Sequence, residues 1–199
     1  MQSKPTLVVR HALASVALCA TPAAVSHAQQ VAQTATFYVG RISNANAWHD
    51  LLTSPGQAEF VDAYLAVAAL SREFARQRNG DVTWDVEGQV GYNFGDQSHW
   101  EFNGAFGPRW HAFPWSSSVK TSAAFLFGLS MATEVPEIEV ELEGDSEKLM
   151  IYWCMELAVG PPRGDWSVSW RLHHRSGGFG LFAEDGGMNA LALGARIGF

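Results

Sequence analysis

The feature that most constrains this chain is an alternation of apolar and polar residues with a period of two. Between residues 82 and 94 the even positions hold Val, Trp, Val, Gly, Val, Tyr and Phe, whereas the odd positions hold Thr, Asp, Glu, Gln, Gly and Asn. Successive side chains of a β-strand point to opposite faces, so this pattern predicts a strand with one apolar and one polar face.

The same alternation recurs along the chain. It is clear at residues 82–94, 100–110, 119–131, 149–159, 166–176 and 188–199. Two earlier segments, 34–42 and 60–75, are also interpreted as strands, although the second has enough Ala, Leu and Arg to suit a helix as well. No run of eighteen apolar residues is present, whereas a strand crosses a bilayer in about 9 to 11 residues. The prediction is therefore an all-β fold, an eight-stranded antiparallel transmembrane β-barrel.

Residues 1–28 have the pattern of a secretion signal. Basic residues precede a short apolar run, and Ser26 and Ala28 place small residues at the two positions that a signal peptidase reads. A lipoprotein signal would need a small residue before Cys19, where the chain has Leu. We therefore expect a signal peptide at 1–28 and one outer-membrane barrel domain at 29–199.

The net charge argues against a nucleic-acid partner. The chain holds 13 Lys and Arg against 20 Asp and Glu, a formal charge of −7, which falls to −9 when Lys4 and Arg10 leave with the signal. Nucleic-acid binding requires basic surfaces instead. Cys154 is then the sole remaining cysteine, so no internal disulfide is expected. The sequence also gives no reason to expect a metal or a cofactor.

The predicted connections fit a barrel with short inner turns and longer outer loops. Counted from a periplasmic N-terminus, the inner connections are 77–81, 114–117 and 160–164, and the outer ones are 43–57, 95–98, 134–147 and 177–187. Aromatic residues collect near both predicted interfaces, as expected for membrane strands. They are Trp84, Trp110, Trp115 and Trp166 at the inner rim and Tyr92, Phe94 and Trp100 at the outer rim.

The loop at 134–147 is strongly acidic, with seven Asp and Glu residues. We interpret it as a solvated loop, with divalent ions bridging it to lipopolysaccharide phosphates as the alternative. Because Ile138, Val140 and Leu142 alternate with glutamates, the flanking strands are also candidates to continue above the membrane.

The polar faces of the strands are predicted to fill the lumen. An eight-stranded barrel is too narrow for an aqueous channel, so we expect an ion-paired interior that stabilises the barrel rather than a pore. Its predicted members are Glu87, Glu101, Arg109, His111, Glu156, Arg171 and His173.

Three polar residues interrupt the apolar faces of the last two strands. His174 and Ser176 continue the apolar row of 166–176, and Asn189 begins that of the final strand. All three are expected on the lipid-facing side at the outer-leaflet end. A Ser beside a His suits acyl transfer, because an imidazole can take the hydroxyl proton while a third group orients the ring. The alternative is that these residues mark where the strands leave the hydrocarbon.

The run 172–178 (LHHRSGG), the segment 187–191 (GMNAL) and the terminal aromatic resemble the C-terminus of the outer-membrane lipid A 3-O-deacylases and related acyloxyacyl hydrolase-like proteins. The resemblance implies that His174 is the base and Ser176 the nucleophile. It also implies an exterior site, an outer-leaflet substrate in lipid A or lipopolysaccharide, and an outer-membrane location.

The chain departs from the family pattern at two positions. The family acid is a Glu where this chain has Asn189, whose amide can still accept the imidazole N–H; Glu184 or Asp185 in the preceding loop are alternatives. The family often has Asn after the Ser, where this chain has Gly177, so oxyanion stabilisation would fall to the backbone N–H groups of Gly177 and Gly178.

Three functions therefore remain open at this point. The first is a serine esterase that removes an ester-linked acyl chain from lipid A, and the second is a non-catalytic small outer-membrane barrel with a structural or adhesive role. A third, a soluble periplasmic ligand-binding barrel, would require its apolar faces to point inward. The sequence sets neither the acyl position nor the oligomeric state.

Overall fold

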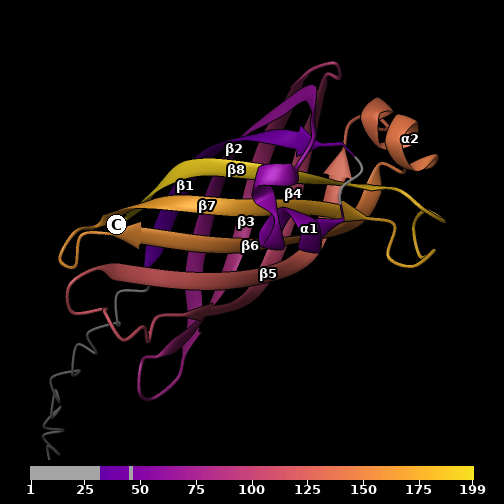
Figure 1. The fold of residues 1–199 in the computed structure, drawn as a ribbon. Helices are drawn as coiled ribbons and strands as arrows, with labels where there is room; N and C mark the ends of the chain where they lie inside the picture. Colours follow the sequence, from indigo (N-terminus) through magenta and orange to yellow (C-terminus); the bar gives the residue numbers. More distant parts are fainter. Residues whose placement is uncertain (1–31, 45–46) are drawn as a thin grey trace, which may run out of the picture. The chain divides into compact units, whose positions relative to one another are not determined.

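The computed structural model describes residues 32–44 and 47–199, which form a closed antiparallel barrel of eight strands. Each strand pairs with the next along the chain, and the last pairs with the first (Figure 1). The predicted fold is thus confirmed, while the predicted signal peptide at 1–28 lies outside the described residues. The strands are β1 (Gln33–Ser43), β2 (Phe60–Arg76), β3 (Val82–Gly95), β4 (His99–Trp110), β5 (Lys120–Ala132), β6 (Leu149–Gly160), β7 (Trp166–Ser176) and β8 (Gly187–Gly198).

The ambiguous segment near residue 60 is a strand. β2 extends over 17 residues and pairs with β1 on one side and β3 on the other. Its inward positions, such as Leu65 and Val67, are buried, whereas Leu70 on the outward row is 55% exposed. The period of two and the two pairing partners therefore prevail over the helical propensity of Ala and Leu.

The outer wall of the barrel is apolar, and the lumen is lined largely by polar groups. Exposed outward-facing side chains include Phe37, Val39, Val86, Val90, Phe102, Phe106, Phe125, Phe127, Trp170 and Leu193. Buried lumen side chains include Glu87, Glu101, Arg109, Glu156, Arg171 and His173, as predicted. A soluble barrel would show the reverse arrangement, so the structure contradicts the periplasmic ligand-binding alternative.

Membrane-spanning helices are a separate question. None of the helices in the described part of the chain has the length and apolar character needed to cross a bilayer.

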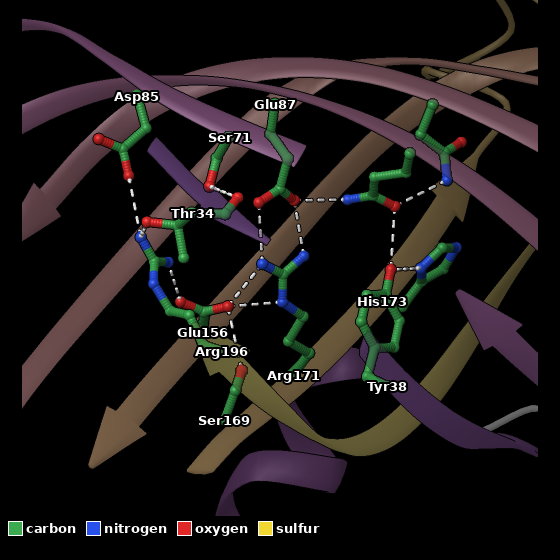
Figure 2. Close-up of polar contacts among 12 residues, drawn as sticks. Thr34, Tyr38, Ser71, Asp85, Glu87, Glu156, Ser169, Arg171, His173 and Arg196 are labelled. Atoms are coloured by element: carbon green, nitrogen blue, oxygen red, sulfur yellow. Dashed lines mark hydrogen bonds and ion pairs between the residues drawn. The ribbon is translucent and has the colours of Figure 1, made fainter. Parts of the chain in front are cut away.

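The inner half of the lumen is filled by an ion-pair network (Figure 2). Arg171 donates two hydrogen bonds to Glu87, at 2.6 and 2.9 Å, and a third to Glu156 at 2.6 Å. Arg109 links the same Glu156, at 2.6 Å, to Asp85, at 2.7 Å. Because every one of these charges faces an opposite charge, their burial is compensated.

At the inner mouth of the barrel, His111 follows the end of β4 and shares a 3.0 Å hydrogen bond with Thr83. Burial and the nearby charge of Arg109 lower the pKa of His111 to about 4. The His111 ring is therefore neutral at physiological pH, and it adds no charge to the network.

In the outer half of the lumen an apolar cluster lies along β8, β1 and β2, and a short helix covers it. α2 (Glu137–Glu143) inserts Ile138 into a cluster with inward-facing side chains of three strands. The buried strand residues of this cluster include Ile42, Leu65, Val67, Met188 and Ala190. Figure 1 shows α2 and the β7–β8 loop at the same end of the barrel, opposite the C-terminus.

Five of the seven Asp and Glu residues in the acidic loop are exposed, as expected for a solvated loop, but β5 and β6 do not continue into it and one of its glutamates is buried. Glu139 of α2 is fully buried and forms an ion pair with Arg175 at 2.7 Å. It also accepts a 2.6 Å hydrogen bond from Ser146. Burial raises the pKa of Glu139 above its usual value, although Arg175 and Ser146 oppose this shift. The alternation of Ile138, Val140 and Leu142 belongs to a short helix with one inward-facing side.

A second helix, α1, lies against the outer wall. α1 (Trp48–Thr53) and the 3₁₀ turn η1 (Pro55–Gln57) belong to the connection between β1 and β2. The Trp48 ring meets Trp153 of β6 edge to face, with centroids 5.7 Å apart. Since β8 and β7 separate β1 from β6 around the barrel, α1 reaches across both strands (Figure 1). This helix was not predicted from the sequence.

Candidate functional site

The candidate site lies where β7 ends and β8 begins. His174 and Asn189 are directly paired across the two strands, and Ser176 is paired with Gly187. All three polar side chains are half-buried, whereas Arg175, between His174 and Ser176, is fully buried in the lumen. The parity of the strands therefore places His174, Ser176 and Asn189 on the outer wall together.

The imidazole of His174 is held by Asn189. His174 Nδ1 lies 2.7 Å from Asn189 Oδ1. An amide oxygen only accepts hydrogen bonds, so this contact places the ring proton on Nδ1 and leaves a lone pair on Nε2. Of the three groups proposed to orient the ring, the amide is therefore the one in contact with it.

The two alternative acids, Glu184 and Asp185, are placed differently. Both residues are exposed in the β7–β8 loop, and within residues 47–199 neither carboxylate forms a hydrogen bond with His174. The backbone N–H of Glu184 instead donates to Asp145 at 3.1 Å, which ties this loop to the loop that contains α2.

The hydroxyl of Ser176 is hydrogen-bonded to the adjacent backbone. Its Oγ accepts a 3.2 Å hydrogen bond from the backbone N–H of Gly178. Among the described residues no hydrogen bond joins Ser176 Oγ to the ring of His174. The two side chains are nevertheless neighbours on one face of β7, and rotation about the Ser176 Cα–Cβ bond would redirect the hydroxyl.

The backbone after Ser176 requires glycine. Gly178 has φ +70°, and a Cβ there would lie 2.9 Å from Ile151 Cγ1. At Gly187, opposite Ser176, φ is +142° and a Cβ would lie 2.4 Å from the carbonyl oxygen of Arg175. The glycines therefore permit a tight loop immediately beside the hydroxyl of Ser176.

The two proposed oxyanion donors differ in availability. The N–H of Gly178 already points at Ser176 Oγ, whereas the N–H of Gly177 donates to the carbonyl of Gly186 at 3.2 Å. Gly178 is thus positioned to donate near the reacting oxygen. Gly177 would first have to release Gly186.

An aromatic side chain that the sequence analysis did not single out packs on the His174 ring. Trp153 of β6 is the cross-strand partner of His174, and the ring centroids lie 4.2 Å apart with an interplanar angle of 31°. Trp48 of α1 contacts the same Trp153 ring edge to face. The outward parity of Trp153 was visible in the sequence, but its register with His174 was not.

The end of β7 is fixed from the lumen side. Arg175 donates to Ser130 Oγ at 2.6 Å and to the carbonyl of Glu147 at 2.9 Å, besides its ion pair with Glu139. These contacts hold the backbone between His174 and Ser176 in place. The buried lumen charge therefore supports the geometry of the outer site.

Within residues 32–44 and 47–199, no three His, Cys, Asp or Glu side chains are close enough together to hold a metal ion. Cys154 is a buried free thiol in the lumen, away from the outer wall.

Comparison with solved structures identifies two similar barrels. The outer membrane enzyme PagL matches with a TM-score of 0.56 and 14% identity, over 82% of this chain and 98% of that chain. Neisserial surface protein A (NspA) matches with a TM-score of 0.49 and 10% identity, over 84% of this chain and 97% of that chain. At this identity the likeness to PagL shows the fold alone. Neither a family model nor a curated protein matches the chain.

Proposed function

We propose that this protein is an outer-membrane serine esterase that removes an ester-linked acyl chain from lipid A. The observation that carries the proposal is the contact between His174 Nδ1 and Asn189 Oδ1 on the outer wall, beside Ser176. A base with a fixed tautomer next to a hydroxyl is the arrangement that acyl transfer needs.

The outer membrane is the proposed location because the barrel is apolar outside and polar inside. Aromatic side chains stand exposed at both ends of the strands, with Trp84, Trp110 and Trp166 at one end and Tyr92, Phe94 and Trp100 at the other. Such belts suit the two interfaces of a bilayer. The proposed signal peptide at 1–28 and the shared fold with an outer-membrane enzyme support the same location.

In the proposed mechanism, Ser176 Oγ attacks the ester carbonyl carbon while its proton moves to His174 Nε2. Asn189 keeps the ring oriented, and the N–H of Gly178 donates to the carbonyl oxygen as it becomes negative. His174 then returns the proton to the departing sugar oxygen, which leaves an acyl group on Ser176. Water, activated by His174, releases that group as a fatty acid.

Asn189 has a specific consequence in this mechanism. A neutral amide fixes the tautomer of His174 but stabilises the protonated ring less than a carboxylate does. We therefore expect a slower enzyme than one with a Glu at this position.

The second candidate function is a non-catalytic barrel with a structural or adhesive role. The observation that favours it is the position of Ser176 Oγ, which is hydrogen-bonded to Gly178 rather than to His174. Hydrogen bonds between catalytic groups are often long before substrate binds, so this geometry is compatible with both candidates.

The deciding experiment is mass spectrometry of lipid A from cells that express the chain or its Ser176→Ala variant at matched levels of folded barrel. The proposal expects a mass loss of one acyl chain with the wild type and none with the variant. An unchanged lipid A mass with well-folded wild type, or equal deacylation by Ser176→Ala, would establish the non-catalytic alternative.

A further inference from the structure

A groove of about 470 Å³ runs along the outer wall over β1 and β2. Ala66 and Ala68 of β2 form its floor. Their cross-strand partners on β1 are Val39 and Phe37, which rise beside them as a wall. Val90 of β3, Trp100 of β4 and Leu193 of β8 also line the groove. The depression therefore results from two small residues placed between larger outward-facing ones.

Arg41 stands at the outer end of this groove. It is the next outward-facing residue after Val39 on β1, and it is paired with Tyr64 of β2. The guanidinium lies over the ring of Tyr64, with Cζ 5.5 Å from the centroid, and it donates to Asp62 at 2.8 Å and to the carbonyl of Val61 at 2.9 Å. These contacts aim the charged group without enclosing it, since 42% of the side chain remains exposed.

A charge at this place is unusual for the barrel. Along the outward rows of the described strands the charged side chains are Arg41, Asp62 and Arg72, and Arg72 lies toward the inner end of β2. Charged groups on a lipid-facing wall are costly unless they reach the headgroup region or pair with an opposite charge. Asp62 is itself 75% exposed and supplies one such partner, while Nη1 of Arg41 donates no hydrogen bond to any described residue.

Arg41 is also close to the candidate site. Its partner on β8 is Leu191, which follows Asn189 on the same outward row. The Cα atoms of Arg41 and Asn189 are separated by one inter-strand spacing and by two residues along β8, which is a distance of roughly 8 Å. A headgroup held at Arg41 would therefore lie beside the reacting groups.

We propose that Arg41 and the groove below it bind an outer-leaflet lipid, with the guanidinium on a headgroup phosphate and one acyl chain in the groove. Arginine recognises phosphate through paired N–H donors, and the apolar lining suits a hydrocarbon chain. The inference deepens the proposed function, because lipid A carries phosphates above several acyl chains, and it rests on the proposed outer-membrane location.

The test is a binding measurement on the full mature barrel in neutral detergent, with Ser176→Ala as the background so that no turnover occurs. Native mass spectrometry would compare lipid A with the same lipid A stripped of its phosphates. We expect roughly tenfold or tighter binding of the phosphorylated form, and loss of this preference in Arg41→Gln. Asp62→Asn, which removes the competing carboxylate, should increase the preference.

Two further variants distinguish the contribution of the groove to lipid binding from that of the charge. Ala68→Phe fills the groove and should weaken the binding of both lipids, while leaving the preference for phosphate. Arg72→Gln is the matched control, since Arg72 is an exposed outward-facing arginine on β2 outside the groove, and it should change nothing.

Equal binding of the two lipids, identical behaviour of Arg41→Gln and Arg72→Gln, or an unaffected Ala68→Phe would each overturn the inference. The result is independent of hydrolysis. If the wild type fails to deacylate lipid A but these binding differences appear, the proposed esterase is wrong and the lipid site is supported. If the wild type deacylates lipid A without these binding differences, the esterase is supported and the lipid site is wrong.

Discussion

His173 and His174 are consecutive residues of β7, but they lie in two different environments. His173 is fully buried in the lumen, 2.9 Å from Glu101 and 3.2 Å from the hydroxyl of Tyr38, with the Tyr152 ring against it. His174 is half-buried on the outer wall, with one nitrogen on Asn189 and one face on Trp153. The inner ring has both nitrogens engaged, whereas Nε2 of the outer ring forms no hydrogen bond with any described residue.

The same contrast holds for the two walls of the barrel. Lumen charges are paired with one another, so their role is to hold the strands together. On the outer wall, neither the hydroxyl of Ser176 nor Nη1 of Arg41 donates a hydrogen bond to a described residue. Substitutions in the lumen should therefore reduce stability, and substitutions at the outer site should reduce activity or binding.

The largest expected effect on stability is that of Arg171→Met. This change leaves Glu87 without an arginine partner and removes one of the arginines that pair with Glu156, which should lower the free energy of unfolding by about 3 to 5 kcal/mol. Urea unfolding in detergent, followed by tryptophan fluorescence, measures this loss of stability. The exposed Arg72→Gln should change stability by less than about 0.5 kcal/mol. Equal stability of the two variants would show that the network does not hold the barrel.

Asn189→Ala should have the next largest effect, on activity rather than on stability. Loss of the hydrogen bond to His174 should lower kcat/KM by about 10- to 100-fold, whereas Asn189→Glu should be equal or faster. Kinetics on lipid A in mixed micelles would measure both. Glu184→Gln and Asp185→Asn are the controls. A large effect of either control with a silent Asn189→Ala would identify the loop carboxylate as the orienting group.

Trp153→Ala should give a smaller loss of activity. Removing the ring frees the imidazole of His174 to rotate, so kcat should fall by roughly tenfold while KM changes little. Trp170→Ala is a matched control, because Trp170 is an outward-facing tryptophan on β7 that is 51% exposed. Should the two variants behave alike, the contact with Trp153 would have no positioning role.

The smallest effect concerns pH. Burial raises the pKa of Glu139 in the folded state. The wild type therefore gains stability relative to Glu139→Gln as the pH falls through that raised pKa. The gain levels off below the pKa that Glu139 has in the unfolded chain. Urea unfolding of both proteins between pH 8 and about pH 4 would measure the difference. A difference that shrinks toward acidic pH would mean that the ion pair with Arg175 outweighs burial.

The sequence predicted most of the barrel because its two faces differ so strongly. A shift of one residue in β3, β4, β6 or β7 would put acidic or arginine side chains on the outer wall, so the alternation determines which side chains face inward. The same parity placed His174, Ser176 and Asn189 together on the outside.

What the sequence did not predict depends on contacts across the barrel. The packing of Trp153 on His174 depends on the register of β6 and β7, and alternation alone does not set that register. Short helices in loops are equally hard to recognise, because α1 and α2 have only six and seven residues and no long apolar period. For that reason the burial of Glu139 was missed, although the sequence showed a glutamate-rich loop.

The most direct test compares His174→Ala with His173→Ala in the same preparation, by urea unfolding and by lipid A mass spectrometry at matched amounts of folded protein. We expect His174→Ala to abolish deacylation with nearly unchanged stability. His173→Ala, which leaves Glu101 without its ring partner, should lose about 1 to 3 kcal/mol of stability while each folded molecule still deacylates. Deacylation by His174→Ala, or its loss in well-folded His173→Ala, would contradict the assignment of chemistry to the outer wall.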